Sequence, residues 1–215
     1  GSTDRTVELA KEHGAKVAFR AWTNDFSAQR NFALEQTDAD WVLYLDADER
    51  LNENVIAEVK RIVASGVMDA QYAFTRKSGA FGKIFSYGVL YPDQVRRLFP
   101  RKAVVWVNKV HEHPECKLPE KHLSGYVTHY TYKDWYEWEG KLCLYTTIWA
   151  EDAYQKGKRT TMAGIFQHSV GAFFKMFVLR RGFLDGGLGI YLCFAHGFYT
   201  MLKYLKLYDL QNKRE

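Results

Sequence analysis

The chain has 215 residues, of which 47% are apolar and 26% charged, a composition typical of a globular domain and not of a disordered segment. The net charge is +5 and the sequence pI is about 9.0, which favours anionic partners such as nucleic acid, an anionic membrane surface or nucleotide phosphates. No Lys/Arg-rich run, zinc motif or RNA-binding aromatic signature occurs, so we do not expect a nucleic-acid-binding protein.

Helices and strands are predicted to alternate in the N-terminal third of the chain. Capped helical periodicity indicates three helices, and short apolar runs indicate two strands. In chain order they are a helix at 3–13 with Val7 and Ala10 facing inward, a strand at 16–19, a helix from about 25 to 36, a strand at 41–46 and a helix at 53–65. This alternation predicts a doubly wound, largely parallel sheet, and it also predicts a first strand-helix-strand unit ahead of the chain.

The pattern becomes β-rich after about residue 70 and helical after residue 130. Strands are predicted at 71–75, 84–90, 95–99 and 104–107. The predicted domains are therefore an α/β core at 1–130 and a helical region at 131–215.

The segment 186–202 contains no Asp, Glu, Lys or Arg. It is shorter than the roughly 20 residues needed to cross a bilayer, so we expect it to lie in the membrane interface. The cationic residues that flank it support this interpretation; they are Arg180, Arg181, Lys203 and Lys206. The alternative is a soluble helical hairpin that uses its aromatic residues as a core.

A cluster of acidic residues follows the strand predicted at 41–46. Asp46, Asp48 and Glu49 come at the end of an apolar run. Desolvated like charges repel one another, whereas ligands of α/β proteins collect at the open carboxyl end of the sheet. Two carboxylates spaced Asp-x-Asp can hold a hard divalent cation and, through it, a diphosphate. The alternative is a solvated acidic turn before the next helix.

Short motifs occur in a characteristic order along the chain. They are Gly1-Ser2-Thr3-Asp4-Arg5-Thr6, Arg30-Asn31-Phe32-Ala33, Leu45-Asp46-Ala47-Asp48-Glu49, Val110-His111-Glu112 and Arg181-Gly182-Phe183-Leu184-Asp185-Gly186. In this order the chain resembles the family-2 glycosyltransferases, and among them the bacterial lipopolysaccharide core β-glucosyltransferases. The resemblance implies the GT-A fold, an α/β fold with a mixed, Rossmann-like sheet flanked by helices, here with a C-terminal helical, membrane-proximal extension.

The resemblance also implies an activity. A sugar would move, with inversion, from a nucleotide-sugar donor, first of all a UDP-sugar, to a lipid-linked saccharide acceptor in lipopolysaccharide or surface polysaccharide assembly. The enzyme would lie peripherally on the cytoplasmic face of the bacterial inner membrane, against its anionic surface. The family's acidic residue that contacts base and ribose does not occur in this sequence, so we expect an N-terminally truncated fragment.

The resemblance assigns roles to the acidic cluster and to the polar residues before it. Asp48, together with Asp46, would position Mg²⁺ or Mn²⁺, and Asp46 would also face the nucleotide sugar. Glu49 is expected to cap the following turn. Arg30 and Asn31 occupy the place of a basic-polar pair near the nucleotide, although a solvated helix face is the alternative for Arg30. Asp4 is expected either to contact the nucleotide or to cap the first helix.

An inverting transfer needs a general base to deprotonate the acceptor hydroxyl. Glu112 is the first candidate because it lies in a polar cluster after a predicted buried strand, and Asp93 is the alternative. His111 and His113 are expected to tune Glu112 or to meet the diphosphate. A zinc site built on His111 and His113 would lack a Cys or carboxylate pattern to complete it.

Arginines are expected to meet the negative charge on the departing diphosphate. Arg96 and Arg97 are neighbours on one strand and point to opposite faces, and Arg97 is the candidate because buried apolar residues follow it. Arg181 and Asp185 lie in a Gly-rich turn and are predicted to form a lid or an acceptor site. The alternative is that these glycines permit a tight bend between two helices.

Two other classes of protein share parts of this pattern. A Mg²⁺-dependent nucleotidyltransferase also pairs acids on an α/β sheet, but it usually carries an N-terminal Gly-rich phosphate loop, which this sequence does not show. A non-catalytic membrane-binding module on the same fold is the third interpretation.

Overall fold

The computed structural model describes residues 2–109 and 112–212, which form a mixed α/β fold. The chain divides into two compact units, and each is described by itself. Unit 1 comprises residues 1–46, 53–74 and 95–125, and unit 2 comprises residues 47–52, 75–94 and 126–215. The helical region predicted at 131–215 therefore belongs wholly to unit 2.

The main sheet has six strands in the hydrogen-bonding order β1-β5-β3-β8-β2, with β4 paired to β3. Their bounds are β1 (Trp41–Leu43), β2 (Glu49–Leu51), β3 (Gln71–Ala80), β4 (Lys83–Ile84), β5 (Asp93–Pro100) and β8 (Glu120–Tyr132). A second sheet pairs β6 (Val105–Val107) with β7 (His113–Glu115). The pairs β1–β5, β2–β8, β3–β4 and β6–β7 are all antiparallel. The predicted α/β sheet flanked by helices is confirmed, but these pairs differ from the largely parallel arrangement expected from the alternation.

The helices of unit 1 begin and end close to their predicted signals. They are α1 (Thr6–Glu12), α2 (Phe26–Glu35) and α3 (Glu53–Ser65), with a 3₁₀ turn η2 (Arg101–Ala103). Asp25 caps α2, since its side chain accepts a hydrogen bond of 2.9 Å from the backbone N–H of Ala28. Gly14 and Gly66 follow α1 and α3 with positive φ, as expected of residues that end a helix.

Two predictions about the N-terminal segment are wrong. Residues 16–19 do not form a strand, and Phe19 is 73% exposed. Helix α1 starts at Thr6 and buries none of its residues, so Val7 and Ala10 do not face a core. Alternating apolar residues make a strand only when another strand supplies backbone partners, and in the described part of the chain no strand pairs with 16–19.

A tight hairpin joins β3 to β4 in unit 2. Ala80 pairs with Lys83, so the loop consists of Phe81 and Gly82 alone. Both loop residues have positive φ, +51° and +75°, as a two-residue type I′ turn requires. Of the strand predicted at 84–90, only Ile84 lies in a strand, β4, and the end of the predicted range forms the 3₁₀ turn η1 (Gly88–Leu90), where Gly88 has a positive φ.

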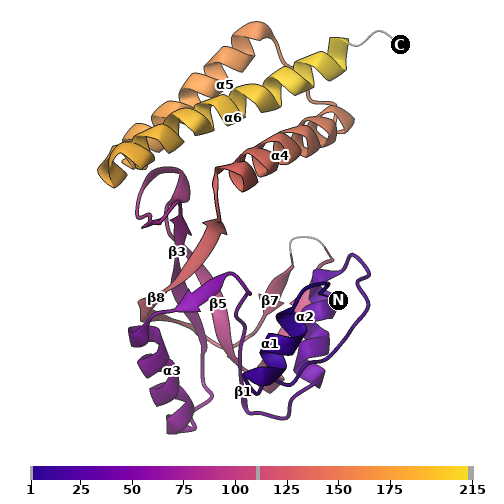
Figure 1. Cartoon of the computed structure of the whole chain (residues 1–215), viewed down its shortest axis with the longest axis vertical. Coiled ribbons are helices and arrows are strands. Elements are labelled where there is room, and N and C mark those ends of the chain that lie inside the picture. Colours follow the sequence, from indigo (N-terminus) through magenta and orange to yellow (C-terminus); the bar gives the residue numbers. More distant parts are fainter. Residues whose placement is uncertain (1, 110–111, 213–215) are drawn as a thin grey trace. The chain divides into compact units, whose positions relative to one another are not determined.

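Three long helices lie side by side at the C-terminal end of unit 2 (Figure 1). They are α4 (Trp135–Gln155), α5 (Met162–Phe174) with its π-helical continuation η3 (Lys175–Leu179), and α6 (Gly186–Asn212), which follows a 3₁₀ turn η4 (Gly182–Asp185). Both α4 and α5 pack on α6. Their shared core contains Ala150, Ala153, Ile165, Tyr204 and Leu207.

Exposed apolar side chains occur on α5 and also on the predicted segment 186–202, where Tyr191, Phe194 and Phe198 are exposed. That segment is the first part of α6, where Leu192, Cys193 and other residues are buried because two helices pack on it. The 18-residue stretch 162–179 has a mean hydropathy of 1.3 and is only 6% buried. By length and composition this stretch is able to cross a membrane.

Candidate functional site

Asp46 lies between two arginines in unit 1. Its Oδ2 accepts a hydrogen bond of 2.6 Å from the guanidinium of Arg97, and its Oδ1 accepts one of 3.1 Å from Arg30. Arg97 is only 5% exposed, whereas its neighbour Arg96 is partly exposed and lies 3.9 Å from Glu120. The opposite orientation predicted for the two arginines is therefore observed, and Arg97 is the one that meets the acidic cluster.

Glu112 is linked to Asp46 through Arg30. Its Oε1 accepts a hydrogen bond of 3.3 Å from Nε of Arg30, a residue 82 positions away in the sequence. The guanidinium of Arg30 also lies over the ring of Trp106, 4.6 Å from its centroid. Arg30 on α2 thus contacts both Asp46, the predicted donor-facing acid, and Glu112, the predicted base. The cluster of Arg30, Arg97, Asp46 and Glu112 contains two cationic and two acidic side chains.

The arginines keep Asp46 ionised. Its burial opposes ionisation, but the charges of Arg97 and Arg30 and their hydrogen bonds outweigh that effect and lower the pKa of the carboxyl. Two charge-assisted hydrogen bonds, one to each oxygen, hold the carboxylate of Asp46 in a fixed orientation.

Asn31 has a structural partner instead of a free amide. Its Oδ1 accepts a hydrogen bond of 2.9 Å from the backbone N–H of Trp106, and its Nδ2 donates one of 2.8 Å to the backbone carbonyl of the same residue. This pair of bonds ties α2 to β6. Asp4 is exposed and accepts a bond of 3.0 Å from the backbone N–H of Thr6, next to the start of α1.

Asp48, in unit 2, has a histidine partner that the sequence pattern did not indicate. Its Oδ2 lies 3.1 Å from Nε2 of His129, and Nδ1 of His129 lies 3.3 Å from the hydroxyl of Thr131. Strand β8 brings this histidine to the acid because β8 pairs with β2, next to Asp48 in sequence. The side chain of Asp48 remains 53% exposed.

Glu49 does not cap a turn, as was predicted, but lies within β2 opposite His129. Its side chain is completely buried and lies 3.8 Å from Arg76, whose positive charge offsets part of the cost of burying the carboxylate. Arg76 also donates two hydrogen bonds, of 2.7 and 3.0 Å, to Asp93. The alternative base is therefore an exposed carboxylate already engaged by an arginine.

Asp185 fixes a loop in unit 2. Its carboxylate accepts hydrogen bonds from the backbone N–H groups of Ser86 (3.1 Å) and Tyr87 (2.7 Å), and it is 6% exposed. Arg181 is exposed and has a positive φ of +52°. A Cβ on Gly182 would collide with the Sγ of Cys193 and would crowd the backbone of Met176 and Gly88, so the glycine permits these segments to pack closely. These contacts favour the tight-bend interpretation over a lid.

The predicted histidine pair is only partly within the described residues. His111 lies outside them, and His113 contacts Asn108 at 3.4 Å. Among residues 2–109 and 112–212, no group of three or more His, Cys, Asp or Glu side chains is arranged to hold a metal ion.

Comparison with known proteins identifies the family. The sequence profile of glycosyl transferase family 2 matches residues 1–112, more than half of the chain. The chain belongs to glycosyl transferase family 2. The match includes Asp4, Arg30, Asn31 and the acidic cluster, and it ends at Glu112. The mixed α/β sheet with flanking helices is the GT-A architecture expected of a family-2 glycosyltransferase.

Relatives of this family-2 chain include glycosyltransferases from several bacteria. An uncharacterized glycosyltransferase of Rickettsia prowazekii is 26% identical over 100% of this chain and 77% of its own length. The prophage-derived glycosyltransferase SunS of Bacillus subtilis is 31% identical over 53% of this chain and 26% of its own length. A TPR repeat-containing protein of Synechococcus elongatus is 53% identical over 24% of this chain and 13% of its own length. The family match and the two relatives named as glycosyltransferases support sugar transfer as the activity.

Replacing Asn31 with Ala is expected to lower the free energy of unfolding by about 1–3 kcal/mol, because the substitution leaves two backbone groups of Trp106 without their partner. Urea unfolding followed by circular dichroism measures the change. Asn54→Ala, at an exposed position in α3, is the matched control and should shift stability by less than about 0.5 kcal/mol. Unchanged stability with a raised KM for the donor would instead make Asn31 a donor contact.

Proposed function

We propose that this protein is an inverting glycosyltransferase that moves a sugar from a nucleotide-sugar donor, a UDP-sugar first of all, to a lipid-linked saccharide in lipopolysaccharide or surface polysaccharide assembly. The observation that carries the proposal is the cluster of Arg30, Asp46, Arg97 and Glu112. It joins residues that the family resemblance associates with the donor, the diphosphate and the base.

The chemistry follows from the side chains of the cluster. Glu112 accepts the proton of the acceptor hydroxyl while that oxygen attacks the anomeric carbon. The bond from this carbon to the nucleoside diphosphate breaks, and its electron pair leaves on the diphosphate. Arg97 and Arg30 stabilise the negative charge that develops there. Because one displacement occurs, the configuration at the anomeric carbon inverts.

Asp46 and Asp48 are the residues that would hold a divalent cation. They are two positions apart in the chain, and Asp48 is half exposed. Mg²⁺ is commonly held by one or two carboxylates together with substrate phosphates and water, which fits a pair of acids without a third protein ligand in the described residues. When bound, Mg²⁺ or Mn²⁺ supplies positive charge for the leaving diphosphate.

A donor screen tests the proposed reaction. The native chain is incubated with a panel of nucleotide sugars and Mn²⁺, and release of the nucleoside diphosphate is measured. We expect release from one sugar nucleotide, UDP-linked first of all. Pyrophosphate released from a nucleoside triphosphate and a sugar phosphate would instead assign a nucleotidyltransferase, and vesicle binding without donor turnover would leave a non-catalytic module.

The proposed location is the cytoplasmic face of the bacterial inner membrane, with α5 and η3 as the attachment element. Their stretch at 162–179 has a mean hydropathy of 1.3, and it exposes Phe166, Phe174 and Leu179. Lys158 and Arg159 precede it, and Arg180 and Arg181 follow it. Exposed apolar side chains flanked by cations suit the surface of an anionic membrane.

Replacing Phe166 and Leu179 with Asp is expected to weaken binding to anionic vesicles at least about tenfold. Each change removes apolar area that the membrane would bury, and it adds a negative charge that the anionic lipids repel. These side chains are 70% and 76% exposed, so the fold should tolerate the changes. Sedimentation with vesicles measures the bound fraction. Val63→Asp, at an exposed site in α3, is the control. Native-like binding by the double variant would contradict attachment through α5.

A further inference from the structure

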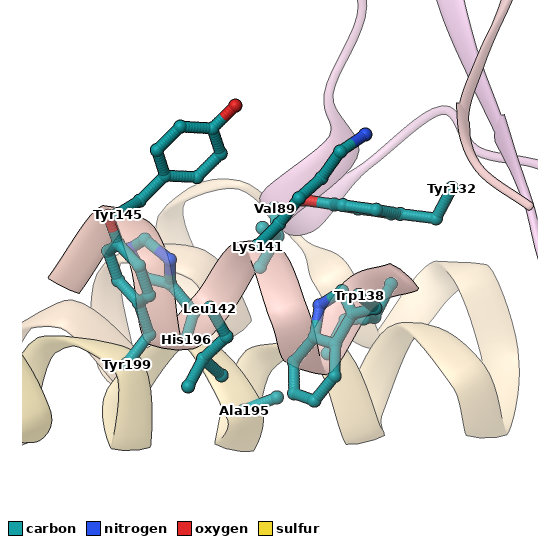
Figure 2. A pocket seen from close by; sticks show the side chains of 10 residues that line it. Val89, Tyr132, Trp138, Lys141, Leu142, Tyr145, Ala195, His196 and Tyr199 are labelled. Atoms are coloured by element: carbon teal, nitrogen blue, oxygen red, sulfur yellow. The ribbon is translucent and has the colours of Figure 1, made fainter. Parts of the chain in front are cut away.

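A cavity of about 140 Å³ lies between α4 and α6 in unit 2 (Figure 2). Aromatic and polar side chains line most of it; they are Tyr132, Trp138, Lys141, Tyr145, His196 and Tyr199. The reaction proposed above uses none of them. The volume is that of a small organic group, about the size of one sugar ring, and not of a whole nucleotide.

Lys141 supplies a positive charge to this cavity. Its ammonium donates hydrogen bonds to Glu137 at 2.7 Å and to the carbonyl of Thr131 at 3.0 Å. An ammonium has three donors, so one remains for a ligand. The hydrogen bond to Glu137 raises the pKa of Lys141 against the opposing effect of burial, and the group stays cationic at neutral pH.

Neutral hydrogen-bonding groups surround the lysine. Within the described residues, the hydroxyls of Tyr132, Tyr145 and Tyr199 and the ring nitrogens of His196 have no protein hydrogen-bond partner. Burial raises the pKa of Tyr132 and Tyr199, so both remain O–H donors, and burial with nearby lysines lowers the pKa of His196. The cavity therefore presents several polar groups that a ligand rich in hydroxyls is able to satisfy.

A larger hollow of about 820 Å³ adjoins the cavity. The two share Tyr132 and Lys141, and the larger one extends to Asp48. Stacked aromatic rings form part of the lining of the larger hollow. The ring centroid of Phe81 lies 3.6 Å from that of Trp135 and 6.0 Å from that of Tyr132, and the three rings are nearly parallel. Phe81 keeps its positive φ of +51° in this stack. A bulky residue in that region is costly and persists only where its surroundings hold it.

We propose that the cavity between α4 and α6 binds one anionic sugar ring of the acceptor, with Lys141 as its counter-ion. The hydroxyls of the ring bond to the tyrosines and His196, and its C–H face packs on the aromatic side chains. A carboxylate or phosphate on the ring meets Lys141. The adjoining hollow leads the rest of the acceptor toward Asp48. This inference rests on the proposed function, because it names the chemistry of that acceptor.

Binding of single sugars to the native chain tests the inference. D-glucuronate, D-glucose and inorganic phosphate are titrated separately, and saturation-transfer NMR measures each dissociation constant. We expect glucuronate to bind about tenfold more tightly than glucose, since it adds one charge-assisted hydrogen bond. Glucuronate should also bind more tightly than phosphate, which lacks a ring. Equal affinities for glucuronate and glucose, or tighter binding of phosphate, would overturn the inference.

Two variants locate the binding. Lys141→Gln should remove the preference for glucuronate, and Tyr199→Phe should weaken both sugars while the fold stays intact. Lys156→Gln is the matched control, because Lys156 also lies on α4 and forms an i,i+4 pair, with Asp152 at 2.8 Å, but outside the cavity. An equal effect of Lys156→Gln, or native binding by Tyr199→Phe, would contradict the proposed site.

The binding assay separates this inference from the proposed function. Donor turnover without glucuronate binding would reject the anionic-sugar site and leave the glycosyltransferase intact. Glucuronate binding without turnover of any nucleotide sugar would reject the glycosyltransferase activity and leave the anionic-sugar site intact.

Discussion

Replacing Glu112 with Gln is expected to lower the rate of sugar transfer about 10²- to 10⁴-fold while the affinity for the donor stays unchanged. Glutamine keeps the shape of the side chain, and its amide oxygen is still able to accept the hydrogen bond from Arg30. It cannot accept the proton of the acceptor hydroxyl. The loss should therefore occur in kcat, which initial rates at saturating donor measure, with donor affinity measured by calorimetry.

Asp93→Asn is the matched control for this prediction. Asp93 is paired with Arg76, and its side chain is 54% exposed. The Asp93→Asn variant should therefore retain a near-native rate of sugar transfer. If Asp93→Asn abolished transfer and Glu112→Gln did not, the role of base would move to Asp93. If Glu112→Gln also abolished donor binding, Glu112 would be part of the donor site and not the base.

Replacing Asp48 with Asn is expected to lower Mn²⁺-dependent donor turnover at least about 100-fold, because a cation at the leaving diphosphate is worth several kcal/mol of stabilisation. The amide is still able to interact with His129, so the local fold should survive. Electron paramagnetic resonance of Mn²⁺ in the presence of UDP measures binding independently of turnover, and the variant should lose the UDP-dependent signal.

Asp69→Asn is a suitable control, since Asp69 is an exposed carboxylate paired with Lys121 at 3.1 Å. It should retain both the signal and the turnover. Full turnover by the native chain in EDTA, or a native Mn²⁺ signal in Asp48→Asn, would show that Asp48 holds no metal needed for the reaction.

Local chemistry made part of the site predictable from sequence. The second helix was expected to begin at about residue 25, and Asp25 caps it, because capping needs only a side-chain oxygen three residues before an N–H. The alternation of side chains along a strand separated Arg97 from Arg96 in the same way. Both inferences rest on rules that act within a few residues.

Contacts between residues far apart in the sequence account for the site features that were not predicted. His129 meets Asp48 because β8 pairs with β2, about eighty residues earlier in the chain. The contact of Glu112 with Arg30 and the burial of Glu49 beside Arg76 arise in the same way. No spacing within one segment indicates such partners.

Tertiary packing decides which side of each apolar helix is exposed. The charge-free stretch at 186–202 lies in α6, which packs against α4 and α5 yet exposes Phe194 and Phe198. Helix α5 packs on α6 and exposes Phe166 and Phe174. Composition indicates that both helices are apolar, but it does not say which of their side chains are covered.

The central claim, that this chain transfers a sugar from a nucleotide to a lipid-linked saccharide, is tested most directly by following the sugar itself. The native chain is supplied with Mn²⁺, the radiolabelled UDP-sugar and vesicles that contain bacterial lipid-linked saccharides. The label should enter the lipid fraction in proportion to the UDP released, with inverted anomeric configuration. Label that stays in the aqueous phase with every donor and acceptor, or that enters product only from a nucleoside triphosphate with release of pyrophosphate, would contradict the claim.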